Sequence, residues 1–528
     1  MSAEVDTNKQ NIVAFIHTYQ PDGNFDPYMS SVICAFKRLG LHVHVVRTND
    51  LFPNLGSSSP ETKRSINKLV DFINNVDPAF IFSTNRGGIT QEIMKQTFCP
   101  IITRMVDLVP FYHQGGAEKP LFCERDHVFV PTLETVDAFE IKFPAIAGKV
   151  YYLPFATDPD EYAALKYVKV DVPISFVGTY FYCDQVIKML SELRGDPGKR
   201  KVFLRLMRDI ERDFHVHFDT LDYADNITEL CLDFEIEAEA LRMQVSNVFA
   251  LNKRIHYLDS VSDLGLKLYG TSNWIHVSSY SLKLLDCFQF DEKIDSRDKL
   301  LKVYQGSKIA LNIPHHQAGA GMPYRVYDIM ASKAMLITEY HEDSELFDIF
   351  GKDVPIPMYR DAAELRNLIE YYLNNEEERQ IIVKRCNELI YEKEATFADR
   401  AKAYCAAVNL NVDSFEQNSG KLLYVKLGRQ GWYSTESTES TESIESIESI
   451  ESKRGIRDRV IGLISWVLPY QLYLQWALAE KSLEHSSAPV DLKRLRKLRS
   501  VLKKLGQIAK WILPYKLWVI LQQLKRAL

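Results

Sequence analysis

A segment rich in groups that could bind a phosphorylated ligand runs from 314 to 328 and reads PHHQAGAGMPYRVYD. It offers two glycines, a tyrosine at the expected start of a helix, a cation and a carboxylate: Gly319, Gly321, Tyr324, Arg325 and Asp328. Glycines let a backbone approach a ligand closely, and free amides at a helix start can hold a diphosphate. Arg325 and Asp328 share a helical face, where the first could bind phosphate and the second ribose hydroxyls. The segment predicts a nucleotide-binding turn, and the alternative is a plain strand-to-helix turn with an exposed ion pair.

Loops after other expected strands carry further candidates, because open α/β sheets bind ligands outside the carboxyl ends of their strands. The run ISFVG ends at Gly178 and is followed by Thr179, and both suit the approach of a phosphate. The run LKLYG ends at Gly270, and Trp274 lies just beyond it, where a nucleobase could be contacted. The alternatives are glycines that merely end strands and a tryptophan that packs in a core.

Several loop residues could bind a ligand or move a proton. His316 could hydrogen-bond a phosphate or the sugar, and a histidine satisfied locally is the alternative. Its neighbour His315 does not join it in a metal site, since adjacent side chains diverge in an extended segment. A general base for an acceptor hydroxyl could come from His17, Asp107 or His113, which end or follow early strands. Each of these could instead cap a helix or lie on the surface, and a reaction that retains configuration needs no such base.

Short β-rich runs alternate with helical stretches over two parts of the chain. From 11 to about 155 the runs are NIVAFIH, LHVHVV, AFIFST, PIITRM, DHVFVP and KVYYLPF. From 174 to 359 they are ISFVG, LKLYG, KIALNI, MLITEY and VPIPMY. Such alternation is typical of βαβ units around a parallel sheet. Helical periodicity is expected from about 204 to 255 and from 361 to about 408. The sequence therefore predicts an α/β fold with two domains, 1–156 and 157–410.

The second half resembles the CgeB-like, or spore-maturation, glycosyltransferases. The resemblance covers about 150 to 405 and rests on LPFATDPDEY, DVPISFVGTY, SKIALNI, MPYRVYDIMASKAMLITEYHEDSELF, YRDAAELRNLIEYYLNNEEERQ and TFADRAKAY. The family usually has Phe-Glu where this chain has Tyr327-Asp328, which keeps the carboxylate but shortens its reach. The resemblance implies a GT-B fold, in which two Rossmann-like domains face each other across a cleft and the second holds a nucleotide-sugar donor.

The same resemblance implies roles for individual residues. It implies transfer without a metal, a contact between Glu345 and the donor sugar, and an acidic residue near Asp107. An acidic loop in water is the alternative for Glu345. The run Asp158-Pro-Asp160 is similar to the DxD metal motif of the other large glycosyltransferase fold. Because it falls at the junction of two α/β halves, we interpret it as an interdomain linker, with a metal site as the alternative.

Charged residues are distributed unevenly along the chain of 528 residues. Its 46% hydrophobic and 25% charged content fits a globular protein and excludes a wholly disordered or polytopic membrane chain. Residues 411–452 are a predicted linker that ends in a Ser, Thr, Glu and Ile repeat too polar to pack. Residues 453–528 carry 16 Lys or Arg against 4 Asp or Glu, and they repeat the pattern WVLPYQL and WILPYKL. They predict amphipathic helices that dock on an anionic membrane surface, and packing on the acidic body is the alternative.

Together these features predict a GT-B glycosyltransferase with no metal and no other cofactor, whose nucleotide-sugar donor is a substrate. The expected acceptor is a cell-envelope glycan, a lipid-linked sugar or a protein, and no nucleic acid partner is expected. The N-terminus lacks the basic and apolar regions of a secretory signal, so the expected location is the cytoplasm, at the inner face of the membrane. The alternatives are a nucleotide-sugar epimerase on the same fold and a non-catalytic protein that binds sugar nucleotides at the membrane.

Overall fold

The computed structural model describes residues 9–16, 27–47, 60–107, 122–214, 216–427 and 432–436. The chain divides into two compact units, residues 1–444 and 445–528, and all of the described residues belong to the first. The predictions for the polar repeat from 437 onwards and for the basic helices at 453–528 lie outside the described residues. Within the described ranges, no helix combines the length and the apolar character needed to cross a membrane.

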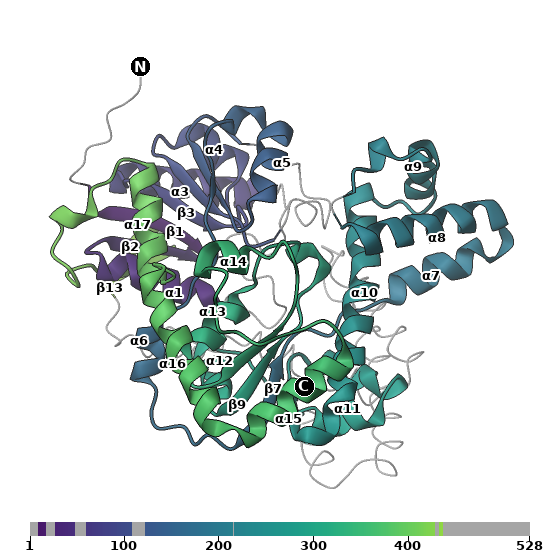
Figure 1. Ribbon diagram of the computed structural model, residues 1–528. Helices are drawn as coiled ribbons and strands as arrows, with labels where there is room; N and C mark the ends of the chain where they lie inside the picture. Colours follow the sequence, from purple (N-terminus) through teal and green to yellow (C-terminus); the bar gives the residue numbers. More distant parts are fainter. Residues whose placement is uncertain are drawn as a thin grey trace, which may run out of the picture. The chain divides into compact units, whose positions relative to one another are not determined.

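The first half is built on a sheet in the order β13-β12-β2-β1-β3-β4-β5-β6, parallel except for β13 (Figure 1). Its six N-terminal strands are β1 Asn11–Ile16, β2 His42–Arg47, β3 Ile81–Thr84, β4 Ile101–Arg104, β5 Asp126–Val130 and β6 Val150–Tyr152. The helices between them are α1 Pro27–Arg38, α3 Pro60–Val76, α4 Gln91–Gln96 and α5 Glu134–Lys142. Strands such as β1 and β4 are buried almost throughout, as expected for a parallel sheet covered on both faces.

The second half is built on a parallel sheet in the order β11-β10-β9-β7-β8. Its strands are β7 Val172–Val177, β8 Leu266–Tyr269, β9 Ser307–Asn312, β10 Met335–Glu339 and β11 Met358–Tyr359. Its principal helices are α12 Arg297–Gln305, α13 Tyr324–Ala331, α14 Glu345–Phe350, α15 Ala362–Asn374 and α16 Glu376–Glu392. Every strand predicted from the sequence is present in these two sheets, so the predicted α/β fold is confirmed.

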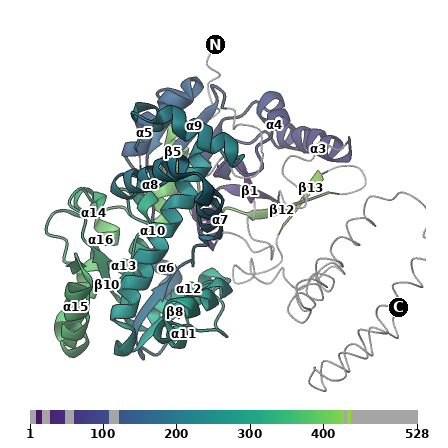
Figure 2. The same ribbon diagram turned by 90° about the vertical axis from the view of Figure 1, so that its right-hand side faces the viewer.

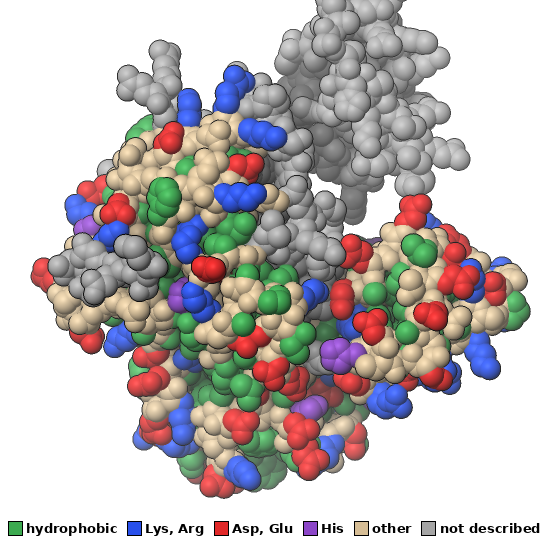
Figure 3. Space-filling model, turned by 90° about the horizontal axis from the view of Figure 1, so that it is seen from above, with side chains coloured by type: hydrophobic (Ala, Val, Ile, Leu, Met, Phe, Trp, Pro, Cys, Tyr) green, Lys and Arg blue, Asp and Glu red, His purple; other side chains and the backbone are tan. Residues whose placement is uncertain are grey.

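A helical insertion separates β7 from β8. It consists of α7 Asp184–Glu192, α8 Pro197–Arg212, α9 Ala224–Asp233 and the first part of α10 Ala238–Ser260. The insertion has its own core, which includes Phe203, Leu230 and Leu241, whereas Leu251 and Leu258 of the same α10 belong to the core of the second sheet. In Figure 2, α10 runs from the insertion to the sheet beside α11 Leu282–Cys287. Acidic and basic side chains are interspersed on the insertion in Figure 3, as on a solvated surface.

The chain returns to the first half after α16. Thr157 and Thr396 form a parallel bridge, at which the backbone N–H of Phe397 donates to the carbonyl of Thr157 (2.9 Å). Helix α17 Phe397–Ala407 then packs in the core of the first half, and β12 Leu422–Leu427 and β13 Trp432–Glu436 extend its sheet beside β2. This corrects the predicted boundaries, since part of 157–410 and part of the linker 411–452 belong to the first half. Because β12 pairs with β2, it covers an edge of β2 that would otherwise be exposed.

Candidate functional site

Two arginines meet at the carboxyl ends of the second sheet. The guanidinium carbon of Arg254, on α10, lies 5.6 Å from the ring centroid of Phe176 on β7, and that of Arg325, on α13, lies 5.2 Å from it. Arg325 donates to the side-chain oxygen of Asn312 at 3.1 Å, and Arg254 donates to the carbonyl of Thr179. Cations held on an aromatic ring at a strand end are well placed to bind an anion.

The arginine pair is unusual because no carboxylate of the described part of the chain forms an ion pair with either member. Arg254 is buried, and its Nε has no hydrogen-bond partner. Burial, together with the nearby charge of Arg325, lowers the pKa of Arg254 well below its usual value. Two cations in a partly dehydrated site repel each other, so the arrangement is costly without a ligand anion. We infer that the pair is the candidate anion-binding site.

Polar groups around the arginines come from α10 and from the loop after β9. The Nε2 atom of His315 contacts the side-chain oxygen of Asn247 (3.1 Å), and its Nδ1 accepts from the N–H of Gln317 (3.0 Å). Burial lowers the pKa of His315 to about 3, so this ring is neutral at physiological pH. His316, one of the predicted ligands, has a buried Nδ1 without a partner, and burial also lowers its pKa. A neutral ring with an unpartnered nitrogen can hydrogen-bond an oxygen-rich ligand.

The loops after β7 and β8 lie side by side, as the sequence predicts. A Cβ atom at Gly270 would come within 2.1 Å of the carbonyl oxygen of Gly178, so glycine is needed for this close approach. Thr179 is exposed, and its carbonyl faces Arg254. Trp274 is fully buried, and its Nε1 donates to the carbonyl of Gly178 (2.8 Å). This corrects the expected base contact, because the indole packs in the core and has no face available for stacking.

The glycine-rich turn faces the first half of the protein. Gly319 has a φ of 52°, which favours glycine, and a Cβ atom at Gly321 would lie 2.2 Å from Cγ2 of Thr132. Tyr324 is buried between two aromatic rings, with centroid distances of 3.9 Å to Tyr28 and 3.9 Å to Phe155. This corrects the prediction that the turn approaches a diphosphate at Gly321, because Thr132 occupies the space beside this glycine.

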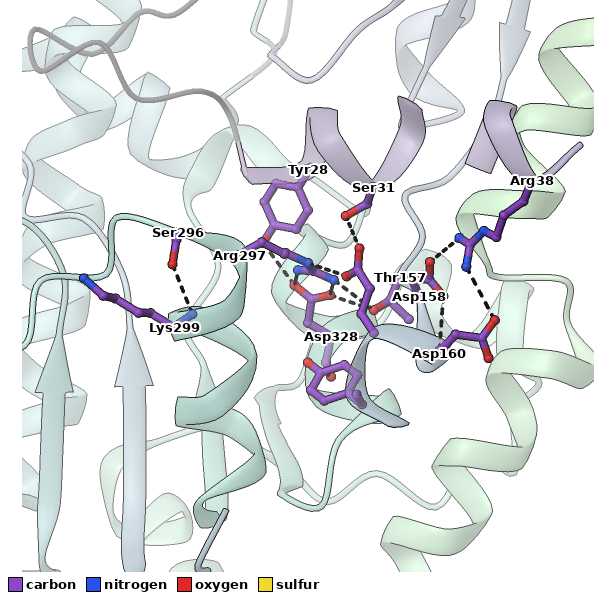
Figure 4. Close-up of polar contacts among 12 residues, drawn as sticks. Tyr28, Ser31, Arg38, Thr157, Asp158, Asp160, Ser296, Arg297, Lys299 and Asp328 are labelled. Atoms are coloured by element: carbon purple, nitrogen blue, oxygen red, sulfur yellow. Dashed lines mark hydrogen bonds and ion pairs between the residues drawn. The ribbon is translucent and has the colours of Figure 1, made fainter. Parts of the chain in front are cut away.

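Asp328 lies in a buried network at the junction of the two halves (Figure 4). Arg297 donates to both of its carboxylate oxygens, at 2.7 and 2.8 Å, and further donors are the hydroxyls of Thr157 (2.7 Å) and Tyr28 (3.1 Å). Arg297 also pairs with Glu161 at 2.8 Å. The carboxylate therefore has protein donors in place of the ribose hydroxyls that the sequence predicts. Arg325 and Asp328 are near neighbours on α13, but only Arg325 lies in the candidate anion site.

The same junction contains the interdomain linker. Asp158 caps α6 Pro159–Ala164 by accepting from the N–H of Asp160 (3.1 Å), and it also forms an ion pair with Arg38 of α1. Figure 4 shows Arg38 between Asp158 and Asp160, which are the two carboxylates of the DxD-like run. These contacts agree with the interpretation of the run as a linker between the halves.

Glu345 joins the halves from the second sheet. Its carboxylate accepts from the backbone N–H of Leu133 (2.7 Å) and from the hydroxyl of Tyr152 (2.9 Å), and both donors belong to the first half. The side chain is buried, and this burial raises the pKa of its carboxyl group. The expected contact with a donor sugar is therefore replaced by a contact between domains.

One candidate base lies within the described residues. Asp107 follows β4, and its carboxylate accepts from the side-chain amide of Asn85 (2.6 Å). His17 and His113 lie outside the described residues. Sequence reasoning missed Asn85, Arg254 and Arg297. A signal existed for Arg254, which shares one stripe of α10 with buried Leu251 and Leu258 and so is a cation at an apolar position.

The contact between Gly321 and Thr132 can be tested by a pair of substitutions. Gly321→Ala should destabilise the protein by about 1–3 kcal/mol, because the new Cβ overlaps Cγ2 of Thr132. Thr132→Ser removes that methyl group and keeps a hydroxyl for the contact with Thr135 (3.0 Å), so the double variant should recover most of the loss. Urea unfolding curves of the four proteins measure the coupling. Additive effects would show that the halves do not approach here.

The junction network makes a second prediction. Arg297→Ala should cost about 3–5 kcal/mol of unfolding free energy, because it leaves Asp328 buried without a cation. A matched control is Lys299→Ala, on the same helix, where the ion pair with Asp295 is exposed and contributes at most about 1 kcal/mol. Unfolding in urea distinguishes the two. Equal losses in the two variants would contradict the assignment of Arg297 as a buried anchor.

Comparisons with solved structures find glycosyltransferases, at low similarity. A glycosyltransferase from Rickettsia africae has 12% identity and a TM-score of 0.40 over 76% of this chain and 100% of its own. The T4 phage β-glucosyltransferase has 11% identity and a TM-score of 0.41 over the same shares of the two chains. An Anabaena protein solved in complex with UDP-glucose has 9% identity and a TM-score of 0.39, over 75% of this chain and 99% of its own. These values carry no information about the substrate of this chain.

Sequence comparison gives a family match for the part of the chain that holds the arginine pair. No curated protein sequence matches the chain. Membership of the CgeB-like glycosyltransferases in particular stays a prediction from the sequence. The family model described as Glycosyl transferase-like matches residues 254–406, which run from Arg254 to the C-terminal part of α17, so this segment is similar to that family.

Proposed function

We propose that the protein is a glycosyltransferase that moves a sugar from a nucleoside diphosphate donor to an acceptor hydroxyl. One observation carries this proposal, namely the pair Arg254 and Arg325, which have no carboxylate partner among the described residues and lie at the carboxyl ends of β7 and β9. Ligands of open α/β sheets bind at this edge. The match of residues 254–406 to a glycosyl transferase-like family supports the choice of reaction.

The chemistry of transfer explains why such a site needs cations. When the bond between the sugar and the phosphate breaks, negative charge develops on the departing diphosphate. Preorganised donors stabilise that charge without having to reorganise during the reaction. Arg254 and Arg325 supply it with two guanidinium groups, each able to bind two phosphate oxygens. We therefore propose that transfer is independent of a metal, because the arginines supply the positive charge that a metal would otherwise provide.

The acceptor side of the reaction belongs to the first half. We propose Asp107 as the general base, because the carboxyl edge of its sheet contacts the second half through Arg104, whose guanidinium lies 4.6 Å from the Tyr324 ring centroid. His17 and His113 remain predictions from the sequence. The expected acceptors are hydroxyls of a cell-envelope glycan, a lipid-linked sugar or a protein. The donor sugar is proposed to be a hexose.

Substitution of the arginines tests the proposal. Arg254→Met and Arg325→Met keep most of the side-chain volume and remove the charge, so each should lower kcat by about 100-fold to 1,000-fold. The measurement is nucleoside diphosphate release from a panel of nucleotide sugars, with and without membrane extract, and with and without EDTA. Release that depends on the acceptor distinguishes transfer from epimerisation, and EDTA should have no effect.

A matched control is Arg208→Met, which removes an exposed arginine of α8 and should leave the rate unchanged. The thermal midpoint of the Arg254→Met protein should not fall by more than a few degrees, because a costly buried charge is removed with its volume conserved. Unchanged turnover in both arginine variants would contradict the proposed anion site.

We propose in addition that residues 453–528 dock the enzyme on the inner face of the cytoplasmic membrane. The argument is the sequence alone, which alternates Leu, Trp and Tyr with 16 basic residues. Each basic residue near an anionic leaflet contributes about 1 kcal/mol of attraction, and the apolar stripe adds burial in the headgroup region.

Vesicle sedimentation tests the docking. The full chain should bind vesicles of phosphatidylcholine mixed with phosphatidylglycerol, and a chain that ends at 444 should not. As a matched variant, replacement of the basic residues between 493 and 499 by Gln keeps the apolar stripe and should weaken binding to the anionic vesicles. Equal binding of the full and shortened chains would contradict the docking.

A further inference from the structure

Two consecutive non-glycine residues after β3 have left-handed backbones. Asn85 has a φ of 48° and Arg86 a φ of 57°. Such conformations are uncommon outside glycine and persist where the surroundings impose them. Here the N–H of Asn85 donates to the carbonyl of Arg104 (2.8 Å), and Arg86 forms a buried ion pair with Asp126. The strained turn is therefore held from both sides.

The turn directs the amide of Asn85 at one loop, the loop that follows β4. Its Oδ1 atom accepts from the backbone N–H groups of Val106 (2.7 Å) and Asp107 (3.3 Å). Its Nδ2 atom donates to Oδ2 of Asp107 at 2.6 Å. Three hydrogen bonds from one side chain thus fix both the backbone and the carboxylate of Asp107.

The edge of the sheet that carries Asp107 contacts the second half of the protein. Arg104, at the end of β4, lies over Tyr324. Leu133, after β5, and Tyr152, at the end of β6, both donate to Glu345. Three neighbouring strand ends therefore face the half that holds the arginine pair, and the carboxylate of Asp107 belongs to this edge.

We infer that Asn85 is a positioning residue, which holds Asp107 as the base for the acceptor hydroxyl, so that transfer inverts the configuration of the sugar. This inference rests on the proposed function. In the step, Asp107 takes the proton of the acceptor hydroxyl, and the acceptor oxygen forms a bond to the anomeric carbon from the face opposite the diphosphate. The bond to the phosphate oxygen breaks at the same time, and the nucleoside diphosphate leaves with the electron pair.

The side-chain amide of Asn85 contacts the carboxylate of Asp107 directly, at 2.6 Å. Arg86 is paired with Asp126, and Arg104 lies over an aromatic ring. The amide of Asn85 donates to the charged form of Asp107 and so favours it. If Asn85 only braced the turn and Asp107 were not the base, loss of Asn85 would weaken folding without moving the acidic limb of the transfer reaction.

The pH profile of acceptor transfer separates these roles. Asn85→Gly tolerates the left-handed backbone and removes the donor, so the acidic limb of kcat/KM should move to higher pH. Asn85→Asp puts a second carboxylate beside Asp107 and should move that limb further, by at least about one pH unit. Asp107→Asn should lower transfer by about 100-fold to 10,000-fold. Product NMR should show inverted anomeric configuration.

A control in the same region is Thr90→Ala, which removes the cap of α4 and weakens the structure without touching Asp107, so its acidic limb should stay in place. Retained configuration in the product would overturn the inference and leave the proposed function standing. An unmoved acidic limb in both Asn85 variants would also overturn it. No release of nucleoside diphosphate from any donor by the unaltered protein would overturn the proposed function and this inference together.

Discussion

The buried carboxylate of Asp328, which pairs with Arg297 of the same half, links the two halves by accepting hydrogen bonds from Tyr28 and Thr157. Asp328 is fully buried, and a carboxylate in that environment is stable only when cationic and hydroxyl donors surround it. Those donors come from α12, from the interdomain linker through Thr157 and from α1 through Tyr28. One carboxylate thereby fixes three segments that are distant in sequence. A single group that needs several partners can specify a domain arrangement that apolar contacts alone would leave looser.

Charged side chains with an ion-pair partner and those without one have different roles in this protein. The charges at the junction have complementary partners, as in the pairs of Arg297 with Asp328 and of Arg38 with Asp158. Arg254 and Arg325 have none among the described residues, and they share one aromatic ring. The first kind of charge stabilises the fold, whereas the second costs stability until an anion binds. This contrast is why we assign structure to the first group and ligand binding to the second.

The sequence predicts the sheets well because a buried parallel strand is a short apolar run, visible without knowledge of its neighbours. It fails for β12, whose pairing with β2 joins Leu422 to Val43 across most of the chain, and for β13, which pairs with β12. The apolar run LLYVKL of β12 is separated from the other strand-like runs by a long helical segment, and β13 (WYSTE) is largely polar and adjoins a low-complexity repeat, so this part of the chain looks like a linker. Trp274 shows the same limit inside the site, because a tryptophan after a strand can pack or stack, and only the neighbouring Gly178 carbonyl decides.

The glycine-rich turn shows why residue type alone could not locate the site. A backbone that approaches a phosphate and a backbone that approaches Thr132 make the same demand for a missing Cβ, so the two cases give the same sequence. Helical spacing has a similar ambiguity. Residues three apart are about 60° apart around a helix, and in α13 Arg325 is partly exposed whereas Asp328 and the remaining residues of the helix are buried. The cation is thereby available to a ligand, and the carboxylate becomes part of the frame that holds it in place.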